Sequence, residues 1–281
     1  MRLVTFLHHS HPALGIVHGQ AVTPVPGHSM LDLITAGQDT LADLNALHRT
    51  AVALADAQLL APIPVPKRNI FCVGRNYAEH AKESAGAFGR EAKIPKVPVF
   101  FTKATHAVNG PYGDIPFDPA VSTQIDWEAE LGVVIGRRGK NISQAEAMSY
   151  VFGYTVINDV SARDLQSAHS QFFKGKSLDG ACPMGPWIVT ADEVADPHTL
   201  GIRCRVNGVI KQEAVTSQMI FKIPALIESL SLGMTLEPGD VIATGTPSGV
   251  GFARTPPEFL KPGDVVECEV DGVGTIRNRV A

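Results

Sequence analysis

The sequence has few cysteines, no long apolar run and no excess of basic charge, and each absence excludes a class of protein. Its 281 residues contain 24 Lys and Arg against 28 Asp and Glu, and the net charge of −4 gives no broad basic surface for a phosphate backbone. We therefore expect no nucleic-acid partner and favour a small-molecule ligand. The first residues lack the apolar core of a signal peptide, and no later run approaches the length of a membrane span. These features predict a soluble, cytoplasmic protein that does not bind a membrane.

The cysteines are far apart in the sequence, at Cys72, Cys182, Cys204 and Cys268. None belongs to a Cys-x-x-Cys pair, which argues against both a structural zinc site and a thioredoxin-type motif. We expect four free thiols.

Three common catalytic or nucleotide-binding motifs are also missing. The segment FKGKS at 173–177 resembles the end of a phosphate-binding loop, but Ser170 stands where that loop requires its leading Gly. The segment TGTPSGVG lacks the third Gly of a dinucleotide fingerprint, and no G-x-S-x-G elbow occurs. Nucleotide binding and serine-hydrolase chemistry are therefore disfavoured.

The first part of the chain has the pattern of a small α+β unit. Residues 3–7 and 14–25 are rich in Val, Ile and Thr, which predicts a hairpin with a turn at His18-Gly19. Apolar residues recur at three- and four-residue intervals over 31–54, as in Leu41, Leu44, Leu47 and Val52, which predicts one or two amphipathic helices.

A proline-rich segment, APIPVPKRN, follows these residues. Its prolines cannot donate backbone hydrogen bonds and favour extended conformations, as a linker does. We place a small α+β N-terminal domain at residues 1–65 and a larger domain at residues 66–281.

The larger domain shows the turn chemistry of antiparallel sheets. Asn207-Gly208 and Asp271-Gly272 separate short apolar runs, and Pro-Gly-Asp occurs twice before such a run. Helical patterns interrupt the predicted strands at residues 78–88, 143–150, 162–172 and 220–232. The expected fold class is α+β, mainly β.

The segment IDWEAELGVVIG carries the most chemical information. Glu128 and Glu130 stand two residues apart at the start of an apolar run, and residues i and i+2 of a strand share a face. Two desolvated carboxylates on one face repel each other, so they need a cation or basic groups between them. Taken alone, the pair also fits a solvated strand face.

A third acid, Asp159, ends a second apolar strand in GYTVINDVSARD. Three hard oxygen ligands suit Mg²⁺ or Mn²⁺ rather than zinc, and leave coordination positions for water and substrate oxygens. We expect Mg²⁺ at this site, with Mn²⁺ or Ca²⁺ as alternatives.

Two further segments supply groups for acid–base chemistry. His80 and Glu83 are spaced i, i+3 on an expected helix, where the carboxylate can orient the imidazole and stabilise its protonated form. Lys176 lies in a Gly-bounded segment that can bring an ammonium group beside developing negative charge. Taken alone, these residues also fit an ordinary helix-surface pair and an ordinary surface lysine.

Six motifs follow one another in the order GRNYAEHAKE, EAELG, NDVSARDLQ, GKSLDGACPMGP, SQMIF and TGTPSGVG. In that order, over residues 70–281, the sequence resembles the fumarylacetoacetate hydrolase family. The fourth acidic metal ligand of the large hydrolase of tyrosine breakdown has no counterpart, so the resemblance is to the smaller bacterial-type and acylpyruvase-like branch. It implies a β-roll of mixed sheets, preceded in the chain by a small α+β N-terminal domain, and it also implies a homodimer.

The resemblance also assigns roles to residues. It implies that Glu128, Glu130 and Asp159 are metal ligands, and that Lys176 stabilises negative charge. His80 and Glu83 would be a water-activating pair on a mobile lid at residues 78–93. The substrate-binding residues that it implies are Arg75, Tyr77, Arg163, Gln166 and Thr246.

The implied reaction is metal-dependent hydrolysis of a carbon–carbon bond in a 2,4-diketo acid of the acylpyruvate or fumarylpyruvate type. The alternative uses the same enolate chemistry without water, as isomerisation of an unsaturated 2-keto diacid or decarboxylation of oxaloacetate. A regulatory protein that has kept only the fold is disfavoured, because both the acidic triad and the His–Glu pair are present.

Overall fold

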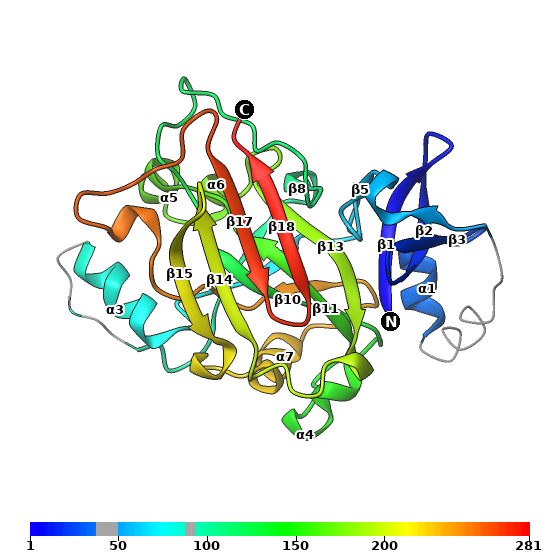
Figure 1. The fold of residues 1–281 in the computed structure, drawn as a ribbon. Coiled ribbons are helices and arrows are strands. Elements are labelled where there is room, and N and C mark those ends of the chain that lie inside the picture. The colour runs from blue at the N-terminus through cyan, green and yellow to red at the C-terminus, as the bar shows by residue number, and fades with distance from the viewer. Residues whose placement is uncertain (38–49, 88–90, 92–93) are drawn as a thin grey trace.

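The computed structural model describes residues 1–37, 50–87, 91 and 94–281, and it has the predicted α+β, mainly β fold class (Figure 1). The N-terminal strands are β1 (Arg2–His8), β2 (His11–His18), β3 (Ala21–Val25), β4 (Val52–Ala53) and β5 (Leu59–Leu60). The strands that follow are β6 (Ile70–Gly74), β7 (Val99–Lys103), β8 (Val108–Asn109), β9 (Ile125–Asp126), β10 (Ala129–Ile135), β11 (Val151–Asn158), β12 (Ser161–Ala162), β13 (Cys182–Thr190) and β16 (Val241–Ala243). A separate sheet contains β14 (Gly201–Val206), β15 (Val209–Val215), β17 (Val265–Val270) and β18 (Gly274–Arg279). The helices are α1 (Met30–Ala36), α3 (Ala78–Ala87), α4 (Gln144–Ala147), α5 (Arg163–Ala168), α6 (Phe173–Lys176) and α7 (Ile223–Ser231).

The N-terminal strands extend the large mixed sheet instead of standing apart from it. The strand order is β4-β3-β2-β1-β13-β11-β10-β16-β6-β7, with β1 paired to β13. In Figure 1 the blue strands accordingly lie beside β13. The predicted domain boundary between residues 65 and 66 stays a prediction.

The N-terminal region differs from the expected hairpin and helices in two ways. It contains five paired strands, with β4 beside β3 and β5 beside β1, and the turn between β2 and β3 lies at Gly19-Gln20, one residue beyond the predicted position. Helix α1 ends at Ala36, and Val52 belongs to strand β4, paired with Val22 of β3. The helix prediction failed at Val52 because strand pairing with β3 prevails over the local apolar spacing. The predicted helical positions Leu41, Leu44 and Leu47 lie outside the described residues.

The larger domain follows the sequence prediction closely. Asn207-Gly208 and Asp271-Gly272 form the turns of the β14–β15 and β17–β18 hairpins. Each of the four predicted helical segments contains a helix over its described residues. All four cysteines are free and buried.

Strand β10 has a buried core on each of its faces. Leu131 and Val133 pack into the cluster shared with α7 and with the four-stranded sheet. In Figure 1 this sheet lies in front of β10 and β11. Val134 packs on the other side, in a cluster that includes α1. The alternation of side chains puts Glu128 and Glu130 on the same side as Val134. Glu130 therefore lies within a fully buried strand, and Glu128 directly precedes it.

Among the helices of the described ranges, none combines the length and the apolar character that a membrane crossing requires.

Candidate active site

Three acidic side chains meet where β10 begins and β11 ends. The two strands are antiparallel, and the Asp159 amide donates to the Glu128 carbonyl oxygen at 2.9 Å. Carboxylate oxygens of Glu128, Glu130 and Asp159 lie within 4.8 Å of one another, and all three residues are buried. The structure thus brings together the acids that the sequence analysis selected as metal ligands.

The surroundings of Glu130 fit a bound cation. Among the residues that the structure describes, Glu130 forms no ion pair, and it accepts one hydrogen bond from the Gly245 amide at 2.7 Å. Burial, and then the charges of Asp159 and Glu128, raise the pKa of Glu130 well above its usual value. A divalent cation would relieve this repulsion, and three carboxylates are hard ligands suited to Mg²⁺, Mn²⁺ or Ca²⁺. The choice of Mg²⁺ stays a prediction.

Two buried lysines also contact the acids. Lys176 Nζ donates to Glu128 Oε2 at 2.7 Å and to Asp159 Oδ2 at 2.8 Å. Lys103 Nζ donates to Asp159 Oδ1 at 2.6 Å and to the Val160 carbonyl oxygen at 2.9 Å. Burial works to raise the pKa of Glu128, but Lys176 and then Arg163 outweigh it and hold this pKa well below its usual value. The sequence analysis missed Lys103. The feature that could have indicated it is a lysine at the end of the strand-like segment VFFTK.

Arg163 connects the acids to the substrate side of the site. Its guanidinium donates to Asp126 Oδ2 at 2.8 Å, to Glu128 Oε1 at 2.6 Å and to Gln166 Oε1 at 3.0 Å. Its charged group also lies 4.4 Å from the centre of the Phe252 ring. The sequence analysis missed Asp126, although it lies two residues before Glu128, at the spacing that defines one strand face.

Glu128 and Glu130 lie in the wall of a cavity of about 900 Å³, whereas Asp159 is not among its lining residues. Of the residues selected from the sequence, the cavity is lined by Arg75, His80, Glu128, Glu130, Arg163, Gln166, Lys176 and Thr246. Tyr77 lies behind the wall: it is 2% exposed, and its buried hydroxyl has no hydrogen-bond partner among the described residues. The roles of Tyr77, Thr246 and the other selected residues in substrate binding stay predictions.

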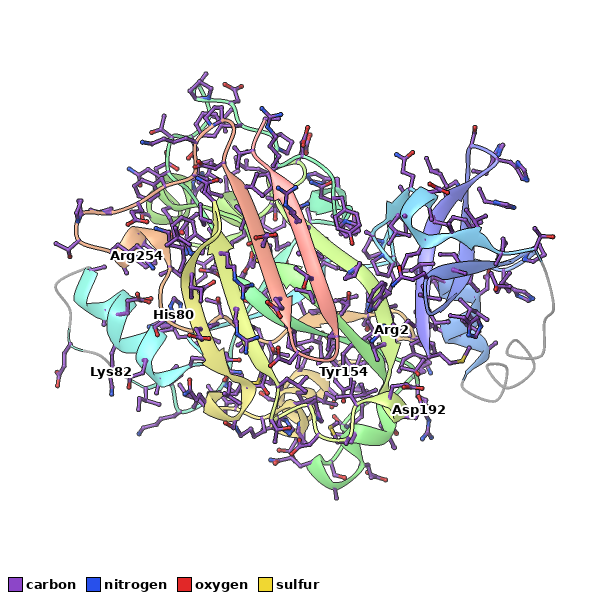
Figure 2. All side chains as sticks on the ribbon, viewed as in Figure 1. Arg2, His80, Lys82, Tyr154, Asp192 and Arg254 are labelled. Atoms are coloured by element: carbon purple, nitrogen blue, oxygen red, sulfur yellow. The ribbon has the colours of Figure 1, made fainter. Side chains whose placement is uncertain are left out.

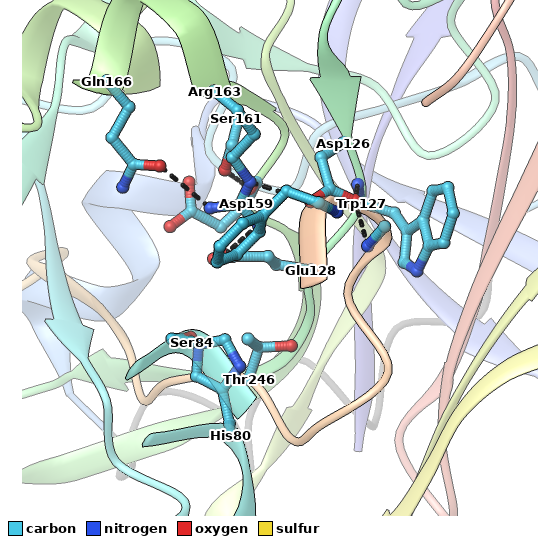
Figure 3. A network of polar contacts seen from close by, with 12 residues as sticks. His80, Ser84, Asp126, Trp127, Glu128, Asp159, Ser161, Arg163, Gln166 and Thr246 are labelled. Atoms are coloured by element: carbon cyan, nitrogen blue, oxygen red, sulfur yellow. Dashed lines mark hydrogen bonds and ion pairs between the residues drawn. The ribbon is translucent and has the colours of Figure 1, made fainter. Parts of the chain in front are cut away.

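His80 lies on the opposite side of this cavity from Glu128 (Figure 3). His80 lies on the side of α3 that faces the sheets, and Lys82 lies on its outer side (Figure 2). His80 Nδ1 lies 3.4 Å from Glu83 Oε2, and Nε2 lies 3.5 Å from the Ser84 hydroxyl oxygen. Since Nδ1 faces a carboxylate, the tautomer that donates from Nδ1 leaves Nε2 free to accept a proton.

The predicted lid is described in part. Residues 78–87 form α3, while residues 88–90 and 92–93 lie outside the described residues. Helix α3 contributes His80, Ala81, Ser84 and Ala85 to the cavity wall. Its movement on ligand binding stays a prediction.

Comparison with known proteins identifies the family of the chain. A sequence profile described as fumarylacetoacetate (FAA) hydrolase C-terminal matches residues 69–281, three quarters of the chain. The chain belongs to the fumarylacetoacetate hydrolase family. A second profile, described as Rv2993c-like, N-terminal, matches residues 1–62. The family inferred from the six motifs is confirmed.

Among relatives, the chain is 47% identical over 268 residues to oxaloacetate tautomerase YisK of Bacillus subtilis, covering 91% of this chain and 87% of that protein. It is 43% identical to the mitochondrial oxaloacetate tautomerase FAHD2A of Bos taurus, covering 100% of this chain and 91% of that protein.

Solved structures confirm the family fold. The fumarylacetoacetate hydrolase of Exiguobacterium antarcticum superposes with a TM-score of 0.87 at 40% identity, covering 100% of this chain and 99% of that one. A 2-hydroxyhepta-2,4-diene-1,7-dioate isomerase of Mycobacterium marinum superposes with a TM-score of 0.81 at 35% identity, covering 100% of this chain and 98% of that one. Maleylpyruvate hydrolase of Sphingobium sp. SYK-6, in complex with manganese(II) and pyruvate, superposes with a TM-score of 0.79 at 31% identity, covering 100% of this chain and 99% of that one.

Proposed function

We propose that this enzyme moves a proton between the enol and keto forms of a 2-oxo dicarboxylate, with oxaloacetate as the first substrate to test. The relatives named oxaloacetate tautomerase and the structurally similar isomerase favour this water-free alternative over carbon–carbon hydrolysis. The observation that carries the proposal is one cavity lined by His80, by Lys176 and by two acids of the triad, Glu128 and Glu130.

Enol–keto conversion moves one proton between the C2 oxygen and C3, and negative charge develops on the C2 oxygen between the two transfers. His80 Nε2 is the group that takes the proton and returns it, while Glu83 stabilises the imidazolium from the Nδ1 side. Lys176 places an ammonium group in the cavity wall, where it can stabilise charge on the oxygen. A bound divalent cation would add Lewis-acid stabilisation of the same charge.

The two carboxylates of such a substrate need separate partners. The first would lie near Arg163 and Gln166, beside the acids that would hold a cation. The second has a candidate partner in Arg75, which lines the cavity and forms no hydrogen bond or ion pair with the other described residues.

The backbone of Arg75 supports this role. Its φ of 55° is an uncommon conformation for a residue with a side chain. The next residue holds it in place: Asn76 is fully buried and donates to the Phe221 and Thr244 carbonyl oxygens at 3.0 and 2.8 Å. Arg75 is a strained and exposed residue of the cavity wall, and its guanidinium has no partner among the described residues, which fits a binding role better than a packing role.

The decisive experiment measures ketonisation directly. Freshly dissolved enol-oxaloacetate is mixed with the Mg²⁺-loaded protein, and loss of the enol absorbance is followed by stopped flow. We expect acceleration in proportion to enzyme concentration, without release of pyruvate. Acceleration no greater than that given by the metal-stripped protein would contradict the proposal.

Hydrolysis remains the second candidate because of the likeness to maleylpyruvate hydrolase, and because a 900 Å³ cavity holds more than a four-carbon diacid. A panel of acylpyruvates, fumarylpyruvate and hydroxymuconate-type diacids tests it. Reaction in ¹⁸O-labelled water distinguishes the classes, since hydrolysis alone places solvent oxygen in a new carboxylate.

We also propose a homodimer and a cytoplasmic location, both from the family resemblance. Light scattering coupled to gel filtration checks the dimer, and cell fractionation checks the location.

A further inference from the structure

Lys103 has a place in the site that differs from that of Lys176. Lys176 lines the cavity, whereas Lys103 is fully buried and is absent from the cavity wall. The Lys103 ammonium lies behind Asp159, held by Asp159 Oδ1 at 2.6 Å and by the Val160 carbonyl oxygen at 2.9 Å. It therefore acts on the carboxylate cluster and not on a ligand in the cavity.

A fully buried lysine is costly, because its ammonium loses its hydration. An apolar side chain of similar length at the end of β7 would avoid that cost, so packing alone does not account for Lys103. The cost is offset by the ion pair with Asp159, which is itself 0% exposed. The charge of Lys103 is thus tied to one of the three acids of the triad.

The effect of this charge follows from a count of the buried ionisable groups in the described cluster. The acids are Asp126, Glu128, Glu130 and Asp159, and the bases that contact them are Lys103, Arg163 and Lys176. Four ionised carboxylates and three cations leave one net negative charge. A bound divalent cation would convert this to one net positive charge. Without Lys103 the same loaded cluster would be neutral.

We propose that Lys103 is a positioning residue that fixes Asp159 and supplies the charge that makes the metal-loaded cluster positive. Its charge opposes metal binding, and it strengthens the attraction of the loaded cluster for the anionic head of a 2-oxo acid. This inference rests on the proposed metal site but not on the reaction that occurs there.

Two substitutions separate charge from hydrogen bonding. Lys103→Gln keeps a donor near Asp159 and removes the charge, whereas Lys103→Met is close in shape and removes both. The matched control is Lys140→Gln, which removes the charge of an exposed lysine beyond the opposite end of β10.

Calorimetry provides readouts that do not depend on turnover. Mn²⁺ is titrated into metal-stripped protein, and oxalate, which carries the two-oxygen head of a 2-oxo acid, is titrated into Mn²⁺-loaded protein. For Lys103→Gln we expect Mn²⁺ to bind roughly tenfold or more tightly and oxalate roughly tenfold or more weakly, as expected for loss of a buried unit charge a few ångströms away. For Lys103→Met we expect the same loss of oxalate affinity but a smaller gain in Mn²⁺ affinity, because Asp159 loses the hydrogen-bond donor that holds its carboxylate in place. Lys140→Gln should match the wild type in both titrations.

Wild-type affinities for both ligands in Lys103→Gln would overturn the role of Lys103, as would weaker Mn²⁺ binding. If Lys103→Gln does not fold, as judged by circular dichroism, unchanged oxalate affinity in Lys103→Met overturns the role. A wild-type protein that binds neither Mn²⁺ nor oxalate overturns the metal site itself, so the two failures are distinguishable.

Discussion

Both carboxylate oxygens of Glu83 accept a hydrogen bond from the backbone amide of Gly249, at 2.9 and 3.1 Å, and Glu83 Oε2 lies 3.4 Å from His80 Nδ1. One side chain therefore attaches α3 to the loop that follows Thr246 and also orients the imidazole. If α3 moves as a lid, breaking this attachment would let the helix, with His80 and Glu83 still paired on it, move away from the loop.

This attachment predicts how α3 exchanges its amide hydrogens. Glu83→Ala should speed exchange over residues 78–87, because the helix loses its link to Gly249, and bound oxalate should slow that exchange in the wild type. Hydrogen exchange with mass spectrometry measures both. The control is Glu79→Ala, which removes an exposed carboxylate paired with Lys82 on the outer side of the same helix. Equal exchange in wild type and Glu83→Ala would show that α3 is held by other contacts.

The raised pKa of Glu130 predicts a pH dependence of stability. Its pKa is raised above the ordinary value of 4.5 by burial and then by Asp159 and Glu128. The stabilising contribution of such a carboxyl is present below its unfolded pKa and is lost as pH rises through its folded pKa. The increase in Tm that Mg²⁺ gives should therefore grow with pH above about 4.5.

Differential scanning calorimetry with and without Mg²⁺ measures this increase. Glu130→Gln should flatten the pH dependence of Tm in the metal-free protein, since the amide does not ionise. Glu213→Gln, at an exposed position, should leave that dependence unchanged. A Mg²⁺ effect on Tm that is constant with pH would contradict the role of Glu130.

Strand geometry is local, so the sequence indicated which acids lie together, while their role as metal ligands came from the family resemblance. Spacing by two placed Glu128 and Glu130 on one face, and a carboxylate at the end of an apolar strand indicated Asp159. The turns at Asn207-Gly208 and Asp271-Gly272 were equally local, since such pairs favour the positive φ of tight hairpins.

The features that sequence reasoning missed depend on contacts between distant parts of the chain. Lys103 and Asp159 are separated by 56 residues, and nothing near Lys103 indicates its partner. Val52 appeared helical because the spacing of its neighbours suits a helix, yet pairing with Val22 decides its conformation. The attachment of Glu83 to Gly249 spans 166 residues and uses a backbone amide, which no side-chain motif records.

The guanidinium of Arg75, which has no hydrogen-bond or ion-pair partner in the described part of the chain, predicts selection for a second carboxylate. Arg75→Gln should weaken binding of N-oxalylglycine about tenfold or more, because an ion pair in the cavity is lost. N-methyloxamate has the same head but no distal carboxylate, and its affinity should change little. Calorimetry on the Mn²⁺-loaded protein compares the two ligands, and an equal loss for both would place Arg75 at the head of the substrate instead.

The position of His80 across the cavity from Lys176 gives the last prediction, which tests whether His80 is a base or a helix-surface residue. If Nε2 takes the proton in enol–keto conversion, His80→Ala should lower kcat by roughly 10²–10⁴-fold while Mn²⁺ affinity and Tm remain close to wild type. The control is His169→Ala, a second histidine of the cavity wall, whose Nδ1 lies 2.9 Å from the Leu165 carbonyl oxygen and which should change kcat little. Decarboxylation of oxaloacetate depends on an oriented carboxylate and on a group that stabilises the developing negative charge more than on a base. Any oxaloacetate decarboxylase side activity should therefore persist in His80→Ala. Loss of tautomerisation with decarboxylation retained assigns the proton to His80, whereas unchanged tautomerisation removes the His–Glu pair from the mechanism and leaves the acidic triad and Lys176 to account for activity.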